Sequence, residues 1–252
     1  MDNNNKEKFH ENYIEGRNAV LEAFRSGKTI DKLFVLDGCQ DGPIKSITRE
    51  ARKHDAIINY VAKERLDQMS ETGKHQGVIA VSAAYEYAEV SDILENAERK
   101  GEPPFIIILD GIEDPHNLGA IIRTAEAAGA HGVIIPKRRR ASLNATVFKT
   151  SAGAASWLPV ARVSNLAATI DMLKENGVWI YGTDGEGQSY TEVKLTGPIG
   201  LIVGSEGFGM GRLIKDKCDF LLSLPMAGKV NSLNASVAAG IFMYEAVRQR
   251  NL

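Results

Sequence analysis

The second half of the chain alternates short apolar runs with segments in which apolar residues recur at helical spacing. Four runs have the length and β-branched content of strands: 105–109, 133–135, 178–181 and 199–203. Three segments have helical spacing: 118–128, 166–175 and 234–248. The run at 105–109 is apolar throughout, which indicates a strand buried on both faces. This alternation predicts an α/β fold with a parallel sheet covered on both sides by helices.

The first 84 residues repeat the alternation on a smaller scale. Strands are predicted at 33–36, 57–61 and 78–81, and helices at 18–24 and 43–54. The polar stretch 72–77 ends in glycine and is typical of a surface loop. Residues 1–8 are polar and are expected to be disordered. The pattern therefore predicts a small N-terminal α/β domain over 1–84.

Residues 85–103 differ from their surroundings in charge. Their six acidic residues are Glu86, Glu89, Asp92, Glu95, Glu98 and Glu102, against two basic residues, and the stretch ends at a Pro-Pro pair. Such a composition predicts a solvated linker with some helix near 91–99. The C-terminal domain is then expected to cover 104–252.

Bulk composition removes several classes of protein. A net charge of −2 gives no broad basic field for binding nucleic acid. No apolar run approaches the length of a membrane span, and the polar N-terminus does not read as a signal peptide. Cys39 and Cys218 are far apart, which favours a reduced, cytoplasmic protein without structural disulfides. The histidines show no metal-ligand spacing, so no metal is expected.

Two glycine- and polar-rich loops follow predicted strands in the last fifty residues. Gly204–Gly211 leaves the run at 199–203, and 224–236 leads into the last helix. Open α/β sheets hold ligands at such strand ends. Glu206 could act in chemistry or cap a helix at 210–215. The glycine order is wrong for a nicotinamide fingerprint.

The third polar motif, Asn231-Ser232-Leu233-Asn234, could likewise supply either a site or only the N-cap of the last helix. Upstream, Asn117 opens the helix at 118–128, and Arg123 lies within it among apolar residues. A buried guanidinium must be paired. Arg123 is therefore either a structural ion-pair partner or a clamp for phosphate or carboxylate.

The only basic run of the chain is Lys137-Arg138-Arg139-Arg140, directly after the predicted strand 133–135. It is either a solvated surface or a contact with a phosphate backbone. The chain has no Ser-His-Asp order and no nucleophile-elbow motif, so acyl hydrolysis is not expected.

The three motifs in this order resemble the SpoU/TrmH family of RNA ribose 2′-O-methyltransferases, within the SPOUT superfamily, and the likeness covers nearly the whole chain. Among its members the chain looks most like the bacterial enzymes that methylate a guanosine of 23S rRNA. The resemblance implies a trefoil knot near the C-terminus, S-adenosylmethionine as cofactor, and a homodimer formed through the catalytic domains. It also implies an N-terminal RNA substrate-binding domain of the L30e/L7Ae fold.

The resemblance assigns roles to particular positions. The catalytic group would comprise Asn117, Arg123, Glu206, Ser232 and Asn234. The cofactor would contact Thr183, Gly185, Gly204, Leu224, Met226 and Leu233. RNA is expected to lie against Arg17, Lys74, His75, Lys137, Arg138, Arg139 and Arg140. Many relatives have valine where this chain has Ala235, which is a change in packing.

Other functions stay open at this point. A tRNA methyltransferase or an antibiotic-resistance 23S rRNA methyltransferase would carry the same motifs. A non-catalytic ribosome-assembly factor would bind RNA without needing Asn117, Arg123, Glu206 and Asn234. In the catalytic reading, Arg123 holds the phosphate beside the target ribose and stabilises the developing alkoxide, because a guanidinium keeps its proton.

Overall fold

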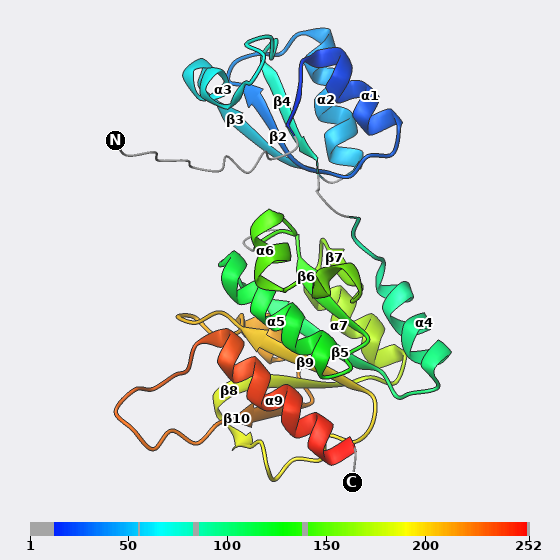
Figure 1. The fold of residues 1–252 in the computed structure, drawn as a ribbon, viewed down its shortest axis with the longest axis vertical. Helices are drawn as coiled ribbons and strands as arrows, with labels where there is room; N and C mark the ends of the chain where they lie inside the picture. The colour runs from blue at the N-terminus through cyan, green and yellow to red at the C-terminus, as the bar shows by residue number, and fades with distance from the viewer. Residues whose placement is uncertain (1–12, 55, 83–85, 138–140, 251–252) are drawn as a thin grey trace, which may run out of the picture. The chain divides into compact units, whose positions relative to one another are not determined.

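The structure is a computed structural model that describes residues 13–54, 56–82, 86–137 and 141–250. Residues 1–8, which were expected to be disordered, and the arginines at 138–140 lie outside the described residues. The chain forms two compact units that divide between Glu86 and Tyr87 (Figure 1).

The N-terminal unit is a mixed four-stranded sheet in the order β1-β4-β2-β3. Its strands are β1 (Tyr13–Glu15), β2 (Ile30–Leu36), β3 (Ile57–Val61) and β4 (Val78–Ser82). Its helices are α1 (Arg17–Arg25), α2 (Gly42–Lys53) and α3 (Lys63–Met69). Only β2 and β3 pair in parallel. Helices α1 and α2 cover one face through residues such as Phe24 and Ile44, and α3 covers the other through Leu66.

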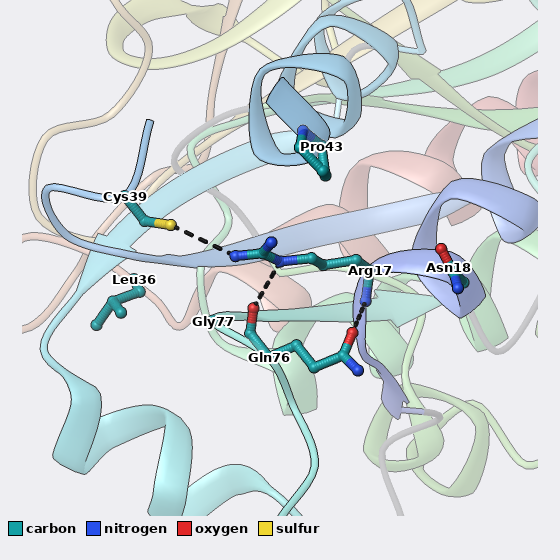
Figure 2. Close-up of a pocket in the computed structure, with 7 residues that line it drawn as sticks. All are labelled: Arg17, Asn18, Leu36, Cys39, Pro43, Gln76 and Gly77. Atoms are coloured by element: carbon teal, nitrogen blue, oxygen red, sulfur yellow. Dashed lines mark hydrogen bonds between the residues drawn. The ribbon is translucent and has the colours of Figure 1, made fainter. Parts of the chain in front are cut away.

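The loop before β4 is tied down at several points. The Glu15 carboxylate accepts hydrogen bonds from Ser70 Oγ (2.6 Å) and from the backbone N–H of Glu71 (2.6 Å). Burial raises the pKa of Glu15, but these bonds and those from Thr72 outweigh it and hold that pKa below its ordinary value. Further along, Arg17 Nε donates to the carbonyl oxygen of Gln76 at 3.1 Å (Figure 2). The loop is therefore a fixed surface.

The C-terminal unit is a six-stranded sheet in the order β10-β8-β9-β5-β6-β7. The strands are β5 (Phe105–Asp110), β6 (Gly132–Pro136), β7 (Val160–Val163), β8 (Trp179–Ser189), β9 (Ile199–Gly204) and β10 (Phe220–Ser223). Every neighbouring pair is parallel. The parallel sheet expected from the alternating apolar runs is confirmed.

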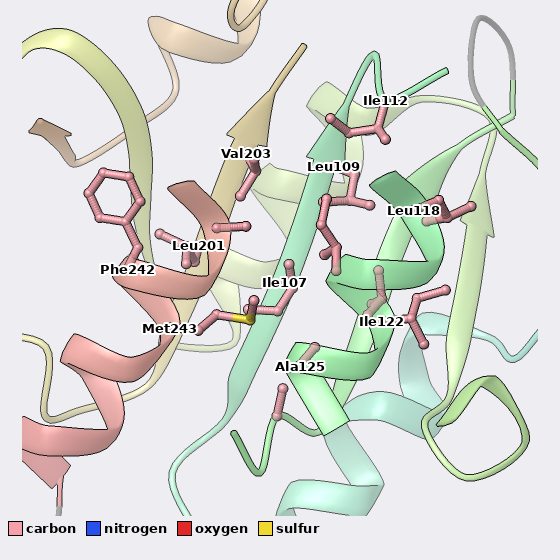
Figure 3. Packing of buried hydrophobic residues seen from close by; sticks show 14 of the residues in the cluster. Ile107, Leu109, Ile112, Leu118, Ile122, Ala125, Leu201, Val203, Phe242 and Met243 are labelled. Atoms are coloured by element: carbon pink, nitrogen blue, oxygen red, sulfur yellow. The ribbon is translucent and has the colours of Figure 1, made fainter. Parts of the chain in front are cut away.

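Helices cover both faces of this sheet. They are α4 (Val90–Lys100), α5 (Pro115–Ala127), α6 (Ala145–Thr150), α7 (Leu166–Glu175), α8 (Arg212–Lys215) and α9 (Ala235–Arg250). Side chains alternate along β5, so Ile107 faces α5 and α9 (Figure 3), whereas Ile106 and Ile108 face the cluster that contains α4 and α7. All three isoleucines are fully buried. The uninterrupted apolar run of β5 reflects this three-layer arrangement.

The acidic stretch 85–103 is not a solvated linker over most of its length. It forms α4, which begins with a capping box between Glu89 and Asp92 and ends at left-handed Gly101. Val90, Ile93 and Ala97 on its inner face are buried against the C-terminal sheet. The acidic residues mask this face in the sequence, because the apolar positions of an amphipathic helix occupy only one stripe.

The chain ends by crossing the sheet. After β9 it passes through α8 to the edge strand β10, and α9 then returns to pack beside α5 (Figure 1). Arg250, near the end of α9, donates to the carbonyl oxygens of Pro104 (3.0 Å) and Gly197 (2.6 Å). Its guanidinium also lies over the Phe105 ring, 4.9 Å from the centroid. The last helix is thereby fixed to the start of β5.

Candidate active site

Strands β5 and β9 end at a common edge of the sheet, and the pairing of β8 with β9 ends beside them. Gly204 at the end of β9 pairs with Asp110 at the end of β5, and Gly182 of β8 pairs with Ile202. Because parallel strands present their carboxyl ends to the same side, the loops that follow them meet there. Asn117 enters this edge in the first turn of α5, where Pro115 starts the helix and the Asp114 carboxylate caps it by accepting the His116 N–H at 3.0 Å.

Asn117, Glu206 and Asn234 form one hydrogen-bonded cluster at this edge. Asn117 Nδ2 donates to Glu206 Oε1 at 3.0 Å, and Asn234 Nδ2 donates to Asn117 Oδ1 at 2.9 Å. Asn234 Nδ2 also donates to Glu206 Oε1. The cluster joins α5, the loop after β9 and the start of α9, so all three sequence motifs contribute one member.

The sequence left open whether Asn234 and Glu206 cap a helix or belong to a site, and the start of α9 decides between these roles. Asn234 Oδ1 accepts from the N–H groups of Ser236 (3.0 Å) and Val237 (3.3 Å), which is the geometry of an N-cap. Glu206 Oε1 accepts from Ala235 N–H at 3.2 Å, so its charge lies at the N-terminus of α9. Both residues therefore cap a helix and belong to the cluster. Glu206 Oε2 accepts no hydrogen bond from any described residue.

Glu206 does not cap α8, the helix that the sequence suggested for it. That end is bonded instead by Asp110, whose Oδ2 accepts the Gly211 N–H at 2.7 Å. Within the loop that joins β9 to α8, Ser205 and Gly209 exchange backbone hydrogen bonds of 3.0 and 2.9 Å, which restrain the loop. A Cβ on Gly204 would lie 2.3 Å from the Gly209 carbonyl carbon, so Gly204 permits this packing.

Arg123 and Ser232 stand outside the cluster. Arg123 is exposed, and its side chain makes no hydrogen bond or ion pair with any described residue. The structural ion pair considered for it is absent within that part of the chain, because the helical period turns Arg123 away from buried Ile121, Ile122 and Ala125. Ser232 is exposed on the loop before α9.

The expected cofactor residues lie along the strand ends and the loop before α9. Thr183 and Gly185 belong to β8 itself, which runs beyond its predicted end to Ser189. Leu224 directly follows β10, and Met226 and Leu233 are each 38% exposed. Residues 225–233 make no hydrogen bond with any other described residue, so their backbone N–H and C=O groups remain available.

The expected RNA contacts divide into accessible and inaccessible groups. Lys74 is exposed, Lys137 is half-buried, and Arg17 is partly exposed in an ion pair with Asp41 at 2.6 Å. The prediction that His75 faces RNA is wrong, because its side chain is buried. Its Nδ1 accepts the Gly77 N–H at 3.0 Å and its Nε2 donates to Asp67 at 2.9 Å, so the imidazole holds the loop from inside.

Two residues that sequence reasoning passed over support the site. Asp110 holds the loop after β9, as described above, and its position as the polar end of an apolar strand was the available signal. Gly119 lets α5 and α6 touch, because a Cβ there would lie 1.8 Å from Thr150 Oγ1. A glycine inside a predicted helix often marks such close packing.

The described residues contain no group of three or more histidine, cysteine, aspartate or glutamate side chains placed to hold a metal ion. Within the same part of the chain, no helix has both the length and the apolar character needed to cross a membrane.

Comparison with known proteins matches both units to family models. Residues 104–244 match the SpoU rRNA Methylase family, and residues 13–88 match the model described as RNA 2′-O ribose methyltransferase substrate binding. A Bacillus subtilis strain 168 protein, YacO, whose name places it in the TrmH family of tRNA/rRNA methyltransferases, is 52% identical over 240 residues. The alignment covers 95% of this chain and 96% of that protein.

Solved structures agree with these matches. The SpoU methyltransferase AviRb from Streptomyces viridochromogenes, crystallised with the cofactor AdoMet, superposes with a TM-score of 0.61 at 26% identity, covering 95% of this chain and 90% of that one. A TrmH/SpoU tRNA modifying enzyme from A. aeolicus superposes with a TM-score of 0.55 at 30% identity, over 63% of this chain and 84% of its own.

Proposed function

We propose, from the premise that this chain belongs to the SpoU rRNA methylase family, that it methylates the ribose 2′-hydroxyl of a guanosine in 23S rRNA. The protein is an S-adenosylmethionine-dependent RNA methyltransferase of a ribose 2′-O-methylating family. We propose in addition which RNA it methylates, which residues act in the reaction and which assembly is active. We propose that the methylation takes place in the cytoplasm, where bacterial rRNA is made.

The observation that carries the proposal is the Asn117–Glu206–Asn234 cluster at the strand ends. Its members come from three segments far apart in the sequence. Glu206 and Asn234 are exposed and Asn117 is half-buried, so none of them belongs to the hydrophobic core. Holding these three side chains in one arrangement costs conformational entropy, and that arrangement places a carboxylate and two amides at the strand ends. Glu206 Oε2 remains free to accept a hydrogen bond from a substrate.

The surrounding residues fit S-adenosylmethionine. The unpaired backbone of 225–233 offers donors and acceptors for an adenine ring, and Met226 and Leu233 offer apolar contact. Thr183, Gly185 and Leu224 would complete the pocket from β8 and β10, with Gly204 at the end of β9. Bound there, S-adenosylmethionine supplies a methyl group activated by its sulfonium. The adjacent Glu206 carboxylate is suited to a cation.

Arg123 is suited to the RNA side of the reaction. Its exposed guanidinium has no partner among the described residues and is therefore available to grip the phosphate next to the target ribose. Methylation of the 2′-oxygen would break the S–CH3 bond of the cofactor, leave S-adenosylhomocysteine and release the hydroxyl proton. A fixed cation beside that oxygen would stabilise the negative charge that develops on it. The Asn117–Glu206–Asn234 cluster holds the loop edges against which the ribose is positioned, with Ser232 on the neighbouring loop.

We propose that the active form is a homodimer through the C-terminal unit. Val237 and Tyr244 lie two turns apart on one face of α9, and each is 51% exposed. Ile241, between them, is half-buried. An apolar stripe on a packed helix is typical of a surface covered by a second chain. A partner on this face would also bring an additional arginine from α5, since α5 packs beside α9.

The chain path supports a C-terminal trefoil knot. The loops that would form it, 204–211 and 224–234, follow β9 and β10, which lie on either side of β8, and α9 packs back against β9 after β10. This packing brings Glu206 against the start of α9, which sequence distance alone would not place together. A threaded chain would also fix the loop that receives the cofactor.

The N-terminal unit favours rRNA over tRNA as substrate. It matches the substrate-binding model over 13–88, whereas the A. aeolicus tRNA enzyme aligns with only 63% of this chain. The names of relatives include both tRNA and rRNA, and the antibiotic-resistance type of 23S rRNA enzyme shares the same motifs. RNA contacts are proposed at Arg17, Lys74 and Lys137, and at the arginines 138–140.

Mapping of ribose methylation tests the proposal directly. rRNA and tRNA would be purified from cells with and without the gene, and from cells carrying Glu206→Ala. We expect one 23S rRNA guanosine to lose its 2′-O-methyl group in the deletion and in the variant. Loss of a tRNA methyl group instead would reassign the substrate, and unchanged methylation of both RNAs would refute the proposal.

A further inference from the structure

A pocket opens in the N-terminal unit between the start of α1, the end of β2 and the loop before β4 (Figure 2). Its volume is about 510 Å³, within the range of small-molecule sites. Arg17, Asn18 and Gln76 give it polar walls, and Leu36 and Pro43 give it apolar ones. It is separate from the Asn117–Glu206–Asn234 cluster, which belongs to the other unit.

Several polar groups in this pocket are unused. The Asn18 amide makes no hydrogen bond with any described residue. Gln76 Oε1 accepts the Arg17 N–H at 3.1 Å, but Gln76 Nε2 has no acceptor in the described part of the chain. Arg17 uses Nε and Nη2 for Gln76 and Asp41, and its Nη1 has no partner among the described residues. Donors and acceptors thus remain available around an apolar floor.

The backbone of the pocket is strained where it turns toward these groups. Gln76 has a φ of 52°, a left-handed conformation that non-glycine residues rarely adopt. It is fixed by its two bonds to Arg17 and by buried His75, which accepts the N–H of Gly77 at 3.0 Å behind it. Strained residues held by their surroundings cluster at ligand sites.

We propose that this pocket receives one unpaired nucleobase of the RNA substrate. The inference rests on the proposed function and adds where, and by what chemistry, the N-terminal unit holds RNA. Leu36 and Pro43 would contact the face of the base, and the Asn18 and Gln76 amides would hydrogen-bond its edge. Single-stranded positions expose both the face and the edge of a base, whereas a duplex hides them.

Cations at the rim suit the adjoining phosphate. Arg17 retains Nη1, and Lys74, two residues before Gln76, is exposed and forms no ion pair with a described residue. The unit carries no broad basic field, so binding there depends on contacts at one place rather than on long-range attraction. A protein partner is the competing occupant, but the match to a substrate-binding model favours RNA.

Binding measurements on the full chain test the pocket. The probes are labelled homopolymers of uridine, adenosine and cytidine and a labelled RNA duplex of equal length, read by fluorescence anisotropy without cofactor. Asn18→Ala is expected to weaken binding of at least one single-stranded probe about three- to tenfold, the effect of one lost hydrogen bond. Duplex binding should not change. Gln68→Ala is the matched control, since it removes an exposed amide from α3 on the opposite face of the sheet.

A second variant separates binding from folding. Gln76→Gly removes the amide while allowing the positive φ, so it should lose single-strand affinity without a large fall in unfolding temperature. Wild-type affinity of both variants for every single-stranded probe would overturn the pocket, and so would equal losses on single strand and duplex. Cofactor binding by calorimetry reports on the proposed function separately, because Asn18→Ala should leave it at the wild-type value.

Discussion

Asn117 and Glu206 are 89 residues apart in the sequence, yet Asn117 Nδ2 donates a 3.0 Å hydrogen bond to Glu206 Oε1. The same carboxylate oxygen accepts the N–H of Ala235 at the start of α9. One acidic side chain therefore joins α5, the loop after β9 and α9. Its loss should affect both folding and methyl transfer, and the two effects can be measured separately.

Replacing Glu206 with alanine is expected to lower the free energy of unfolding by about 1–3 kcal/mol, because Asn117 and Asn234 lose their shared acceptor. Methyl transfer should fall much further than stability explains. Urea titration measures the first effect, and incorporation of labelled methyl groups into RNA at low temperature measures the second. Asn231→Ala, at an exposed neighbour that makes no hydrogen bond with a described residue, is the control for the loop.

Arg123→Lys should lower the rate of methyl transfer without changing the stability of the protein. The side chain is exposed and unpaired within the described residues, so the unfolding free energy should change by less than about 0.5 kcal/mol. Lysine keeps the charge but not the bidentate fork, and kcat at saturating RNA should fall about 100-fold or more. Near-normal turnover would show that Arg123 neither grips the phosphate nor stabilises the alkoxide. Arg212→Lys, exposed on α8, serves as the matched substitution.

The proposed dimer face is open to a direct test. Val237→Glu places a charge in the apolar stripe of α9, where a second chain would have to desolvate it. We expect a monomer of native fold by light scattering, with methyl transfer lost because the site would be incomplete. Trp157→Glu, at another exposed apolar position, should leave the mass unchanged. A wild-type protein that is already monomeric and active would contradict the proposal.

Arg250 is expected to be a stability determinant rather than a participant in the reaction. Arg250→Met leaves the carbonyl oxygens of Pro104 and Gly197 without their donor and removes the contact with the Phe105 ring. A loss of about 1–3 kcal/mol in unfolding free energy follows for an unsatisfied buried group. Urea titration of this variant beside Arg212→Met measures it. Cofactor affinity below the unfolding transition should stay unchanged.

His131 should make the protein less stable in mild acid. It is fully buried, with Nδ1 accepting the Phe105 N–H at 3.0 Å. Burial lowers its pKa below the ordinary value of 6.5, and nearby Lys100 adds to this, although Glu102 opposes the shift. The unfolded chain then binds the proton more readily, so stability is complete above the unfolded pKa and falls as pH drops below it.

The measurement for His131 compares urea midpoints at neutral and mildly acidic pH. Because carboxylates also titrate there, the informative quantity is the difference between wild type and His131→Gln, which should lose part of the pH dependence. His54→Gln, at an exposed histidine, should retain the wild-type slope. An identical slope in wild type and His131→Gln would rule out this residue as a source of acid sensitivity.

Local pattern was sufficient for the strongest elements. The apolar run of β5 and the helical spacing of α5, α7 and α9 predicted those elements and the parallel sheet, because burial on both faces imposes a pattern on every residue of a strand. The short elements β1, α6 and β10 were not predicted from the sequence. The buried apolar stripe of α4 was not predicted, because acidic residues on the outer face of the helix dominate the composition of that stretch.

What the sequence determined by itself was the kind of fold, the family and the motif residues, since these depend on periodicity and on residue type. What only the tertiary structure decided was which of those residues meet. Asn117, Glu206 and Asn234 meet because parallel strands end at one edge and α9 returns to it. His75 is a buried support and Arg123 an exposed cation, because loop closure and helical phase determine exposure. Contacts between distant segments are set by packing, which no local pattern records.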